Sequence, residues 1–401
     1  MIVTPKNGTA PYYDESLLKD VAANAEVIHT GSLEPFAIYN MLQGKAKDSP
    51  IPVGMMGMQH KPSAFKRLST WLRANLFVPD ARRGWNHYAY QAALARAKVG
   101  DIDAIVTTGP PHSTHLVGLR LKAATGLPWL ADLRDPWTNI YYNKTMPRLA
   151  KVRAWDLALE TEVLKTADAV TVVSGGMAEE FADRRGDVQV VYNGYDESDL
   201  PAVHPAKEAG RFTLAHVGNF FPNSDSVGLR AALQRAMKEI ESFADVARFR
   251  FVGLVDSDVL DKYKAAGLER LLDVQGPKSH AEAVMAMFAA DCLVLVLPAD
   301  SDSKIMVSGK IFEYLTTGNP IVGIGAKESG ANTVLKDCER AELMDRDDEG
   351  AIFTFIKATF AEWQMGQTQI GFTESVKKYS RRNLAREMTM HLETMCAKKN
   401  A

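Results

Sequence analysis

Residues 308–325 read SGKIFEYLTTGNPIVGIG, and this stretch sets the architecture that the sequence predicts. Ser308 is a residue type that caps helices, and the helix-forming residues after it continue to the turn at 318–320. The run from Pro320 to Ile324 is short and apolar, which is typical of a buried strand. A helix that leads directly into such a strand indicates a parallel sheet.

The same alternation of apolar runs and helix-length segments extends in both directions. We expect strands at 2–4, 26–30, 103–108, 128–133, 169–174 and 189–192, and again at 212–217, 248–252, 271–275, 293–297, 320–324 and 341–344. Pro201, Pro205 and Gly210 mark a connector between the two arrays. The predicted fold class is therefore α/β, with two facing Rossmann-like domains at 1–205 and 206–375 and a returning helix at 376–401 that belongs to the first.

The composition excludes several classes of protein. The chain has 401 residues, 46% of them hydrophobic and 24% charged, as expected for a globular protein of two or three domains. Its 47 basic and 49 acidic residues leave a net charge of −2, so no nucleic-acid partner is expected. The three scattered cysteines favour a reducing compartment. Without a signal-peptide pattern or a long apolar run, we expect a cytoplasmic protein that contacts a membrane at most peripherally.

Lys310 and Glu313 are the strongest candidates for a binding site. They lie three residues apart near the start of the predicted helix, so both side chains emerge on one side of it. A positive helix end and a lysine ammonium suit phosphate oxygens, and a carboxylate can accept hydrogen bonds from two vicinal ribose hydroxyls. This pattern indicates a nucleotide-diphosphate clamp, and the alternative is an ordinary surface ion pair.

Two loops of the first domain carry polar residues after predicted strands. The loop at 107–115 places His115 at a strand end, either as a ligand-binding group or as a hydrogen-bonded structural histidine. The next such loop presents Arg134 and Asp135, which can bind phosphate and orient or deprotonate a sugar hydroxyl. An internally satisfied salt-bridge network, with Asp132 and Trp137 fastening the loop, is an equally open alternative.

The segment 65–85 has a different character. It carries five basic residues and one acid, with Trp71, Leu72, Leu76 and Phe77 interleaved. Such a segment can lie on an anionic membrane surface. The alternative, which is the more common one, is a helix that packs its apolar face in the core and solvates its basic face.

Taken together, five motifs resemble retaining glycosyltransferases of the family-4 type, which have the two-domain GT-B fold. They are TTGPPHSTHLVGLRLKAATGLPWLADLRDPW from 107, VTVVSGGM from 170, VVYNGYDESD from 190, HVGN from 216 and SGKIFEYLTTGNPIVGIG from 308. Looser similarity in DESLLKD, VPDARRGW and the final helix points to a bacterial subgroup associated with surface polysaccharide assembly.

The resemblance implies that the second domain holds a nucleotide-sugar and the first an acceptor. The donor residues it implies are Glu313 at the ribose, Ser308, Gly309 and Lys310 at the diphosphate, Gly218 and Asn219 approaching by backbone, and Gln275, Gly276 and Pro277 flanking the base. The resemblance places Arg134 and Asp135 near the reacting sugar, on the acceptor side. His115, from the preceding loop, is the third catalytic candidate. Members of this family usually need no metal, so no metal or other cofactor is expected.

The sequence departs from the family pattern in three places. Ile305 stands where the common Glu-x7-Glu motif has its first acid, so only the second acid matches. The loop after Gly218 lacks the basic pair that relatives often have, and Lys304 or Arg230 are the substitutes we expect. The start of the chain resembles the second strand of the first domain, which predicts that about one βα unit is missing and that activity is reduced or absent.

The sequence thus predicts a hexosyltransferase that moves a sugar from a nucleotide diphosphate to a bacterial glycan or lipid-linked acceptor with retention. A diphosphate that helps to deprotonate the acceptor fits this mechanism, because no residue is an obvious nucleophile. The alternatives are a non-catalytic nucleotide- or glycan-binding protein on the same scaffold, a truncated inactive enzyme, and a sugar-nucleotide epimerase.

Overall fold

The computed structural model describes residues 1–6, 21–33, 64–140, 143, 146–299, 305, 307–367 and 371–400. The chain forms two compact units: unit 1 comprises residues 1–172, 181–189 and 390–401, and unit 2 comprises residues 173–180 and 190–389. Residues 190–205, which we expected in the first domain, thus group with the second. The final helix, α15 (Arg381–Asn400), is divided between the units after Thr389.

Unit 1 contains two parallel sheets. β1 (Ile2–Pro5) pairs with β2 (Val27–Thr30), and the second sheet has the order β3-β4-β5-β6. The strands of that sheet are β3 (Ile105–Gly109), β4 (Trp129–Leu133), β5 (Ala169–Val172) and β6 (Gln189–Val190). The expected absence of a first βα unit stays a prediction.

The helices of unit 1 are α2 (Ala64–Leu76), the short η3 (Ala81–Trp85), α3 (Asn86–Ala97), α4 (Ser113–Thr125) and α6 (Ala150–Thr166). All of α7 (Gly175–Phe181) except Phe181 belongs to unit 2. α3 packs against β1, β2 and α4, with a small core of Ala89, Val117 and Leu121. The first turn of α4 is held by Asp80, whose carboxylate accepts from both the backbone N and the Oγ of Ser113 at 2.8 Å. This pair of bonds fixes the loop that precedes α4 at the carboxyl end of β3.

Unit 2 has one five-stranded parallel sheet of order β11-β10-β7-β8-β9. Its strands are β7 (Phe212–Val217), β8 (Ala247–Val252), β9 (Leu272–Gly276), β10 (Cys292–Val296) and β11 (Ile321–Ile324). Its helices are α8 (Val227–Glu239), α9 (Phe243–Val246), α10 (Ser257–Ala265), α11 (His280–Ala289), α12 (Lys310–Thr316), α13 (Gly330–Asp337) and α14 (Glu349–Gln364), with short η4 (Glu197–Asp199), η5 (Pro222–Ser224), η6 (Glu269–Leu271) and η7 (Glu374–Tyr379).

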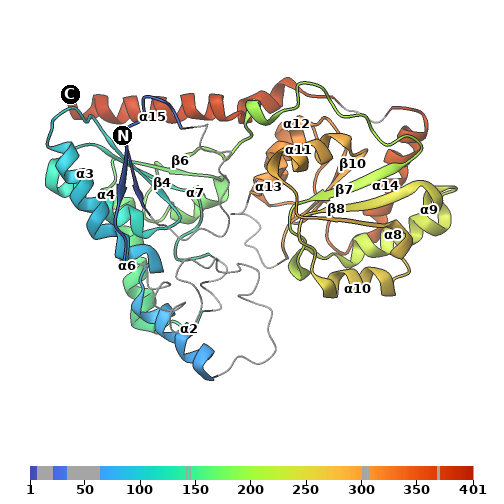
Figure 1. Ribbon diagram of the computed structural model, residues 1–401, viewed down its shortest axis with the longest axis horizontal. Helices are drawn as coiled ribbons and strands as arrows, with labels where there is room; N and C mark the ends of the chain where they lie inside the picture. The colour runs from blue at the N-terminus through green and yellow to red at the C-terminus, as the bar shows by residue number, and fades with distance from the viewer. Residues whose placement is uncertain are drawn as a thin grey trace. The chain divides into compact units, whose positions relative to one another are not determined.

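Helices cover both faces of this sheet (Figure 1). α8, α9, α10 and α14 pack on one apolar core, and α11, α12 and α13 pack on the other. Alternate residues of β7 enter the two cores: Phe212 and Leu214 face one, and Ala215 and Val217 face the other. Burial on both faces explains why these strands are continuous apolar runs. The α/β prediction is confirmed.

One predicted strand is wrong. Residues 341–344 make only an isolated bridge between Met344 and Ile324, and no strand forms there. The polar residues Glu339, Arg340 and Glu342 dilute the short apolar signal, and the segment instead turns back toward α14.

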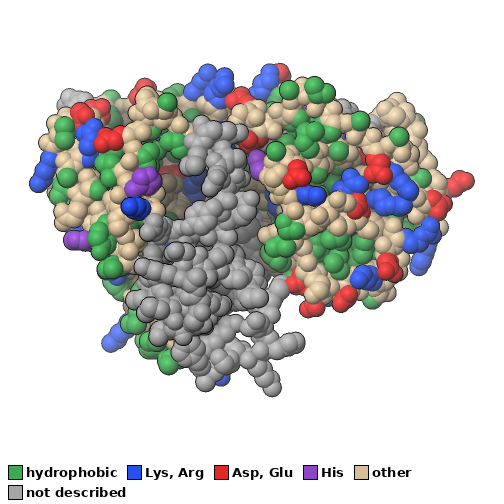
Figure 2. Space-filling model, viewed as in Figure 1, with side chains coloured by type: hydrophobic (Ala, Val, Ile, Leu, Met, Phe, Trp, Pro, Cys, Tyr) green, Lys and Arg blue, Asp and Glu red, His purple; other side chains and the backbone are tan. Residues whose placement is uncertain are grey.

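The surface and the thiols complete the description. On the face of unit 2 seen in Figure 2, basic and acidic side chains are interspersed. Cys292 and Cys338 are buried and Cys396 in α15 is partly exposed, and all three are free. Within the described ranges, no helix is long and apolar enough to cross a bilayer.

Candidate functional site

The candidate site in unit 2 begins at the carboxyl end of β7. The strand ends at Gly218, whose φ of +116° is a backbone conformation that residues with a Cβ rarely adopt. Gly218 N donates to the carbonyl oxygen of Val252 at 2.6 Å, which joins the ends of β7 and β8. Parallel sheets bind their ligands at this edge.

The Lys310 side chain passes directly over Gly218. A Cβ at Gly218 would lie 2.4 Å from Lys310 Cε and 2.5 Å from Nζ, so only glycine leaves room for the lysine. Gly253, at the end of the next strand, has φ +135°, and a Cβ there would lie 2.4 Å from the carbonyl oxygen of Gly218. Gly218 therefore lets the ammonium group of Lys310 lie against bare backbone at the sheet edge, where it can bind phosphate oxygens, and Gly253 lets the next strand end approach Gly218.

Desolvation is the main electrostatic feature of this site. Burial lowers the pKa of Lys310 to about 8, against an opposing contribution from Glu313. The Lys310 Nζ lies 3.3 Å from Nε2 of His216. A bound anion would restore the stabilisation that the ammonium loses by leaving water.

Glu313 lies one turn farther along α12 and lines a small cleft of unit 2. The other lining residues are Tyr195, Asp196, Asp199, Leu200, Val284, Met287 and Thr316. Burial raises the pKa of Glu313, whereas the charges of His280 and Arg381 lower it. The Nε2 of His280 lies 3.0 Å from Asp199 Oδ2. A half-buried carboxylate in this setting can accept hydrogen bonds from ligand hydroxyls.

The loops after β7 and β9 reach the same edge. Asn219 Oδ1 accepts from Leu254 N at 3.2 Å, so this side chain ties the loops after β7 and β8 together. Gly276 O accepts from Gly253 N at 2.9 Å, which places the end of β9 beside that of β8. Gln275 and Pro277 flank Gly276 and are exposed. The structure thus brings the predicted backbone residues to one sheet edge.

The expected helix cap is wrong. The residue before α12 is Gly309, and no side chain caps the helix there; Ser308 instead accepts from Ile311 N through its carbonyl oxygen at 3.1 Å. Because α12 spans only seven residues, Lys310 and the glycine backbone are better candidates for anion binding than the helix end.

Lys304 and Arg230 are the expected substitutes for the basic pair that the loop after Gly218 lacks. Lys304 lies outside the described residues. Arg230 is ion-paired with Asp225 and lies over the ring of Tyr263, which gives it a structural role on α8. At the position of the missing acid, the carbonyl oxygen of Ile305 accepts a hydrogen bond from Ser174 Oγ at 2.6 Å. The polar contact of this residue is therefore made by its backbone, and no carboxylate is present there.

The loop after β4 in unit 1 carries the predicted acceptor-side residues. Arg134 N donates to Gly109 O at 2.9 Å, which links the loops after β3 and β4. Burial raises the pKa of Asp135, and the charge of Arg134 lowers it. Asp132 accepts from the Oγ1 atoms of Thr108 and Thr171, both at 2.8 Å, and so fastens the strand ends. A carboxyl with a raised pKa beside a guanidinium can exchange a proton with a sugar hydroxyl.

Trp137 is buried and anchors the loop after β4, in line with the alternative that Asp132 and Trp137 fasten this loop. Its indole Nε1 donates to Asp156 Oδ1 at 2.8 Å, and Asp156 is ion-paired with Arg148. The Trp137 ring stacks on His112 with ring centroids 5.2 Å apart.

The structure favours the structural alternative for His115 and corrects its assignment to the reaction centre. Its side chain is 0% exposed, its Nδ1 lies 2.9 Å from Thr107 Oγ1, and burial lowers its pKa to about 3. A Cβ on Gly109 would lie 2.7 Å from Nε2 of His115, so the backbone of Gly109 packs directly against the imidazole ring. A neutral, fully enclosed imidazole supports the β3–α4 turn and does not reach a substrate.

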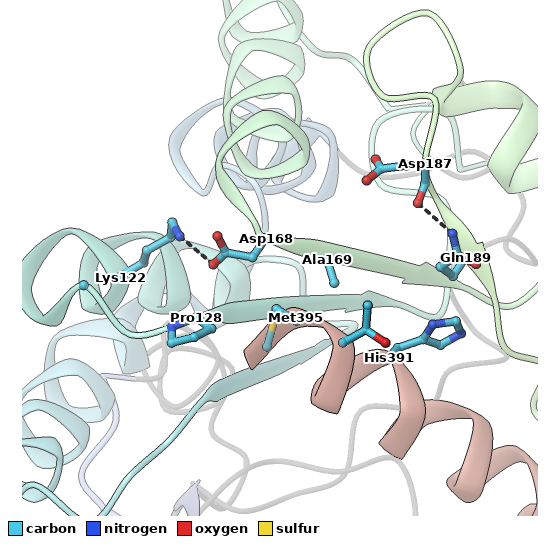
Figure 3. Close-up of a pocket in the computed structure, with 10 residues that line it drawn as sticks. Lys122, Pro128, Asp168, Ala169, Asp187, Gln189, His391 and Met395 are labelled. Carbon is cyan, nitrogen blue, oxygen red and sulfur yellow. Dashed lines mark hydrogen bonds and ion pairs between the residues drawn. The ribbon is translucent and has the colours of Figure 1, made fainter. Parts of the chain in front are cut away.

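A cavity of unit 1 lies at the opposite edge of the sheet. It has a volume of about 330 Å³ and is lined by the starts of β4, β5 and β6 together with α15, as Figure 3 shows. Lys122 and Asp168 form an ion pair at 2.5 Å on its wall. Because these residues precede the strands, the cavity is remote from the carboxyl-terminal edge that carries Arg134 and Asp135.

Sequence reasoning missed two residues of the candidate site, His216 and Gly253. His216 is a polar interruption of the apolar run FTLAHV, and this was the available signal. Gly253 follows a strand just as Gly218 does, but its contact with Gly218 depends on strand order. Within the described residues, no three or more His, Cys, Asp or Glu side chains gather as a potential metal site.

Comparison with known proteins assigns a domain to the first half of the chain. Residues 59–194 match the sequence profile of the glycosyl transferase 4-like domain. No curated protein matches the chain by sequence.

Solved structures share the fold at low sequence identity. HepE of Anabaena, in complex with UDP and glucose, is 14% identical with a TM-score of 0.52 over 76% of this chain and 81% of that one. Sucrose-phosphate synthase of Thermosynechococcus elongatus is 17% identical with a TM-score of 0.56 over 79% and 80%. The N-terminal domain of Candida albicans trehalose-6-phosphate phosphatase is 12% identical with a TM-score of 0.57 over 95% and 87%.

These findings confirm the resemblance that the motifs predicted. The match at 59–194 covers the loops after β3, β4 and β5, and the solved structures supply the two-unit α/β fold. Residues 59–194 thus carry a glycosyl transferase 4-like domain, and the chain as a whole has the GT-B fold.

Proposed function

We propose that this protein transfers a hexose from a nucleotide-diphosphate sugar to a bacterial glycan or lipid-linked acceptor, with retention at the anomeric carbon. The observation that carries the proposal is the Lys310 ammonium, held over Gly218 at the sheet edge, where Gly253 packs against the Gly218 backbone. A partly desolvated cation against the bare backbone of Gly218 suits a diphosphate, which has several oxygens and needs close backbone approach.

The donor is the part of the reaction with the most support. Glu313 accepts hydrogen bonds from the ribose hydroxyls, and Gln275, Gly276 and Pro277 flank the base. HepE, which shares the fold, was solved with UDP and glucose, and this favours UDP as the first nucleotide to test.

The acceptor side and the chemistry follow from unit 1. Arg134 and Asp135 orient the acceptor hydroxyl, and a diphosphate oxygen of the leaving group takes the hydroxyl proton as the new glycosidic bond forms on the same face. Lys310 and backbone donors neutralise the charge that develops on the departing diphosphate. We propose that no metal is needed for this step.

The first test is calorimetric. Glu313→Ala should weaken UDP binding about tenfold, because two hydroxyl contacts to a carboxylate are lost. The 2′,3′-dideoxy analogue lacks those hydroxyls and should bind wild type and variant equally. Glu282→Ala, at an exposed capping position on α11, is the matched control. Unchanged UDP affinity in Glu313→Ala would remove Glu313 from the site.

Ile305 favours a second candidate, a non-catalytic nucleotide- or glycan-binding protein on the same scaffold. An acid at that position would contact the donor sugar, and isoleucine cannot. Incubation of the full chain with UDP-hexoses separates the candidates: transfer to added glycan indicates a transferase, conversion of the donor without acceptor indicates an epimerase, and binding without turnover indicates a binding protein.

We further propose that the protein acts at a membrane surface through α2. Leu68, Trp71, Leu72 and Leu76 are 57%, 39%, 38% and 63% exposed, so the core-packing alternative fails for them. The buried side of the helix is instead at Ala74, 1% exposed. An outward apolar face flanked by basic residues, Arg67 among them, fits an anionic bilayer and a lipid-linked acceptor.

A further inference from the structure

We infer that His216 is a positioning residue for Lys310: its imidazole accepts a hydrogen bond from the lysine ammonium and holds that ammonium at the diphosphate position. The inference rests on the proposed function, in which Lys310 binds the donor diphosphate. It adds a residue that the motifs did not suggest and a physical reason for its presence in β7.

The hydrogen-bond partners of His216 fix which ring nitrogen carries the proton. Nδ1 lies 3.0 Å from the carbonyl oxygen of Val294 in the neighbouring strand β10. A carbonyl oxygen only accepts, so Nδ1 carries the hydrogen and Nε2 presents a lone pair. Lys310 Nζ, at 3.3 Å, is a donor suited to that lone pair. The carbonyl oxygen of Asn219, 3.4 Å from Nε2, offers no hydrogen.

The surroundings keep the imidazole neutral and immobile. His216 is 1% exposed, and burial together with the charge of Lys310 lowers its pKa to about 3. Its ring meets that of Phe220 edge to face, with centroids 4.8 Å apart. A neutral ring that cannot turn away is a permanent acceptor for the lysine and does not repel it at physiological pH.

A positioning role explains why the strand keeps a polar residue in its core. The other residues of FTLAHV are apolar or threonine, and a buried imidazole is costly unless its nitrogens are satisfied. Here one nitrogen bonds the sheet and the other bonds the side chain that the site needs. Gly218, which lies beneath the lysine, has no side chain that could hold the ammonium in place.

The test measures UDP binding by calorimetry from pH 6.5 to 9.5. Among the residues that the structure describes, the titratable groups that act on Lys310 are His216 on β7 and Glu313 on its own helix. Wild-type affinity should fall as the pH rises through about 8, because the ammonium loses its proton. His216→Leu should weaken binding about tenfold at pH 7 and move the fall to lower pH, because the ammonium loses an acceptor.

A double-mutant cycle separates positioning from a structural effect. In a Lys310→Met background, His216→Leu should have no further effect on UDP affinity. His204→Leu, which removes an exposed imidazole of the same unit, is the control and should leave the pH profile unchanged. Equal loss in both backgrounds, or an unmoved pH profile, overturns the inference. His216→Asn, with a shorter side chain, gives the same comparison if leucine is not tolerated.

A second readout does not depend on the nucleotide. The pKa of Lys310 can be followed by NMR after ¹³C-dimethylation of lysines, with Lys310→Met assigning the signal. A lower Lys310 pKa in His216→Leu supports the inference even if wild type binds no nucleoside diphosphate, a result that would refute only the proposed function. An unchanged Lys310 pKa overturns the inference whatever the protein binds.

Discussion

Gly218 meets two separate requirements of the donor site, a positive φ and space for the Lys310 side chain. Gly218→Ala should therefore lower the free energy of unfolding by at least about 1 kcal/mol and also abolish UDP binding. Gly267 has only the first requirement, because its φ is +73° and a Cβ added there would meet no other atom within 4 Å. Gly267→Ala should show a similar loss of stability in urea with UDP affinity intact. Retained UDP binding in Gly218→Ala would show that Lys310 can bind from another position.

The residues that could be predicted are those whose signal is local. Lys310 and Glu313 share a helix, so their spacing placed them in unit 2 near one another. His115 could not be assigned, because its exposure depends on Gly109 and Trp137 closing around it. Likewise, the His216 contact joins residues 94 positions apart in the sequence, and no local pattern encodes it.

At the scale of elements, α2 allows a direct test of membrane binding. Trp71→Glu combined with Leu72→Glu should reduce cosedimentation with vesicles containing about 30% anionic lipid by about tenfold, since two apolar side chains that would enter the bilayer become charged. Val227→Glu adds an acid at an exposed apolar position of α8 in unit 2 and should bind as wild type does.

Salt and lipid composition sharpen that test. Binding that weakens with salt and requires anionic lipid supports the basic and apolar surface of α2. Vesicle binding that survives the double substitution would assign the contact to another part of the chain.

The strands were predictable and some of their connections were not. Runs such as 292–297 are apolar because both faces are buried, and this signal is strong. The segment 341–344 is also largely apolar over its four residues. It nevertheless pairs with β11 only through an isolated bridge between Met344 and Ile324, which its own pattern does not predict. The sequence also predicted a side-chain cap for α12, but no side chain caps this helix. Ahead of the helix, the carbonyl oxygen of Ile305 accepts a hydrogen bond from Ser174, a contact that the local sequence does not encode.

For the whole molecule, the two compact units predict separable responses to a ligand. Unit 1 has two parallel sheets and unit 2 has one, and each unit has apolar core residues of its own. UDP at about 100 times its dissociation constant should stabilise unit 2 by about 2.7 kcal/mol and raise its unfolding transition, since a ligand stabilises what it binds.

Hydrogen exchange locates that effect. Protection by UDP is expected at the loops after β7 and β8 and at α12, with the segments of unit 1 unchanged. Protection centred on the cavity of α15 and the starts of β4 to β6 would contradict the assignment of the donor site.

The sequence predicted two α/β arrays but placed their boundary at 205/206, because the proline-rich connector is a stronger local signal than the contacts that tie 190–205 to unit 2.

The three free cysteines also make the protein chemically addressable. Burial raises the pKa of the Cys292 thiol to about 12 and that of Cys338 to about 11, so neither forms thiolate near neutral pH. Cys396 is partly exposed on α15. A maleimide dye should therefore attach at one place in the native chain, next to the cavity wall at Met395, and report on that helix without any engineered cysteine.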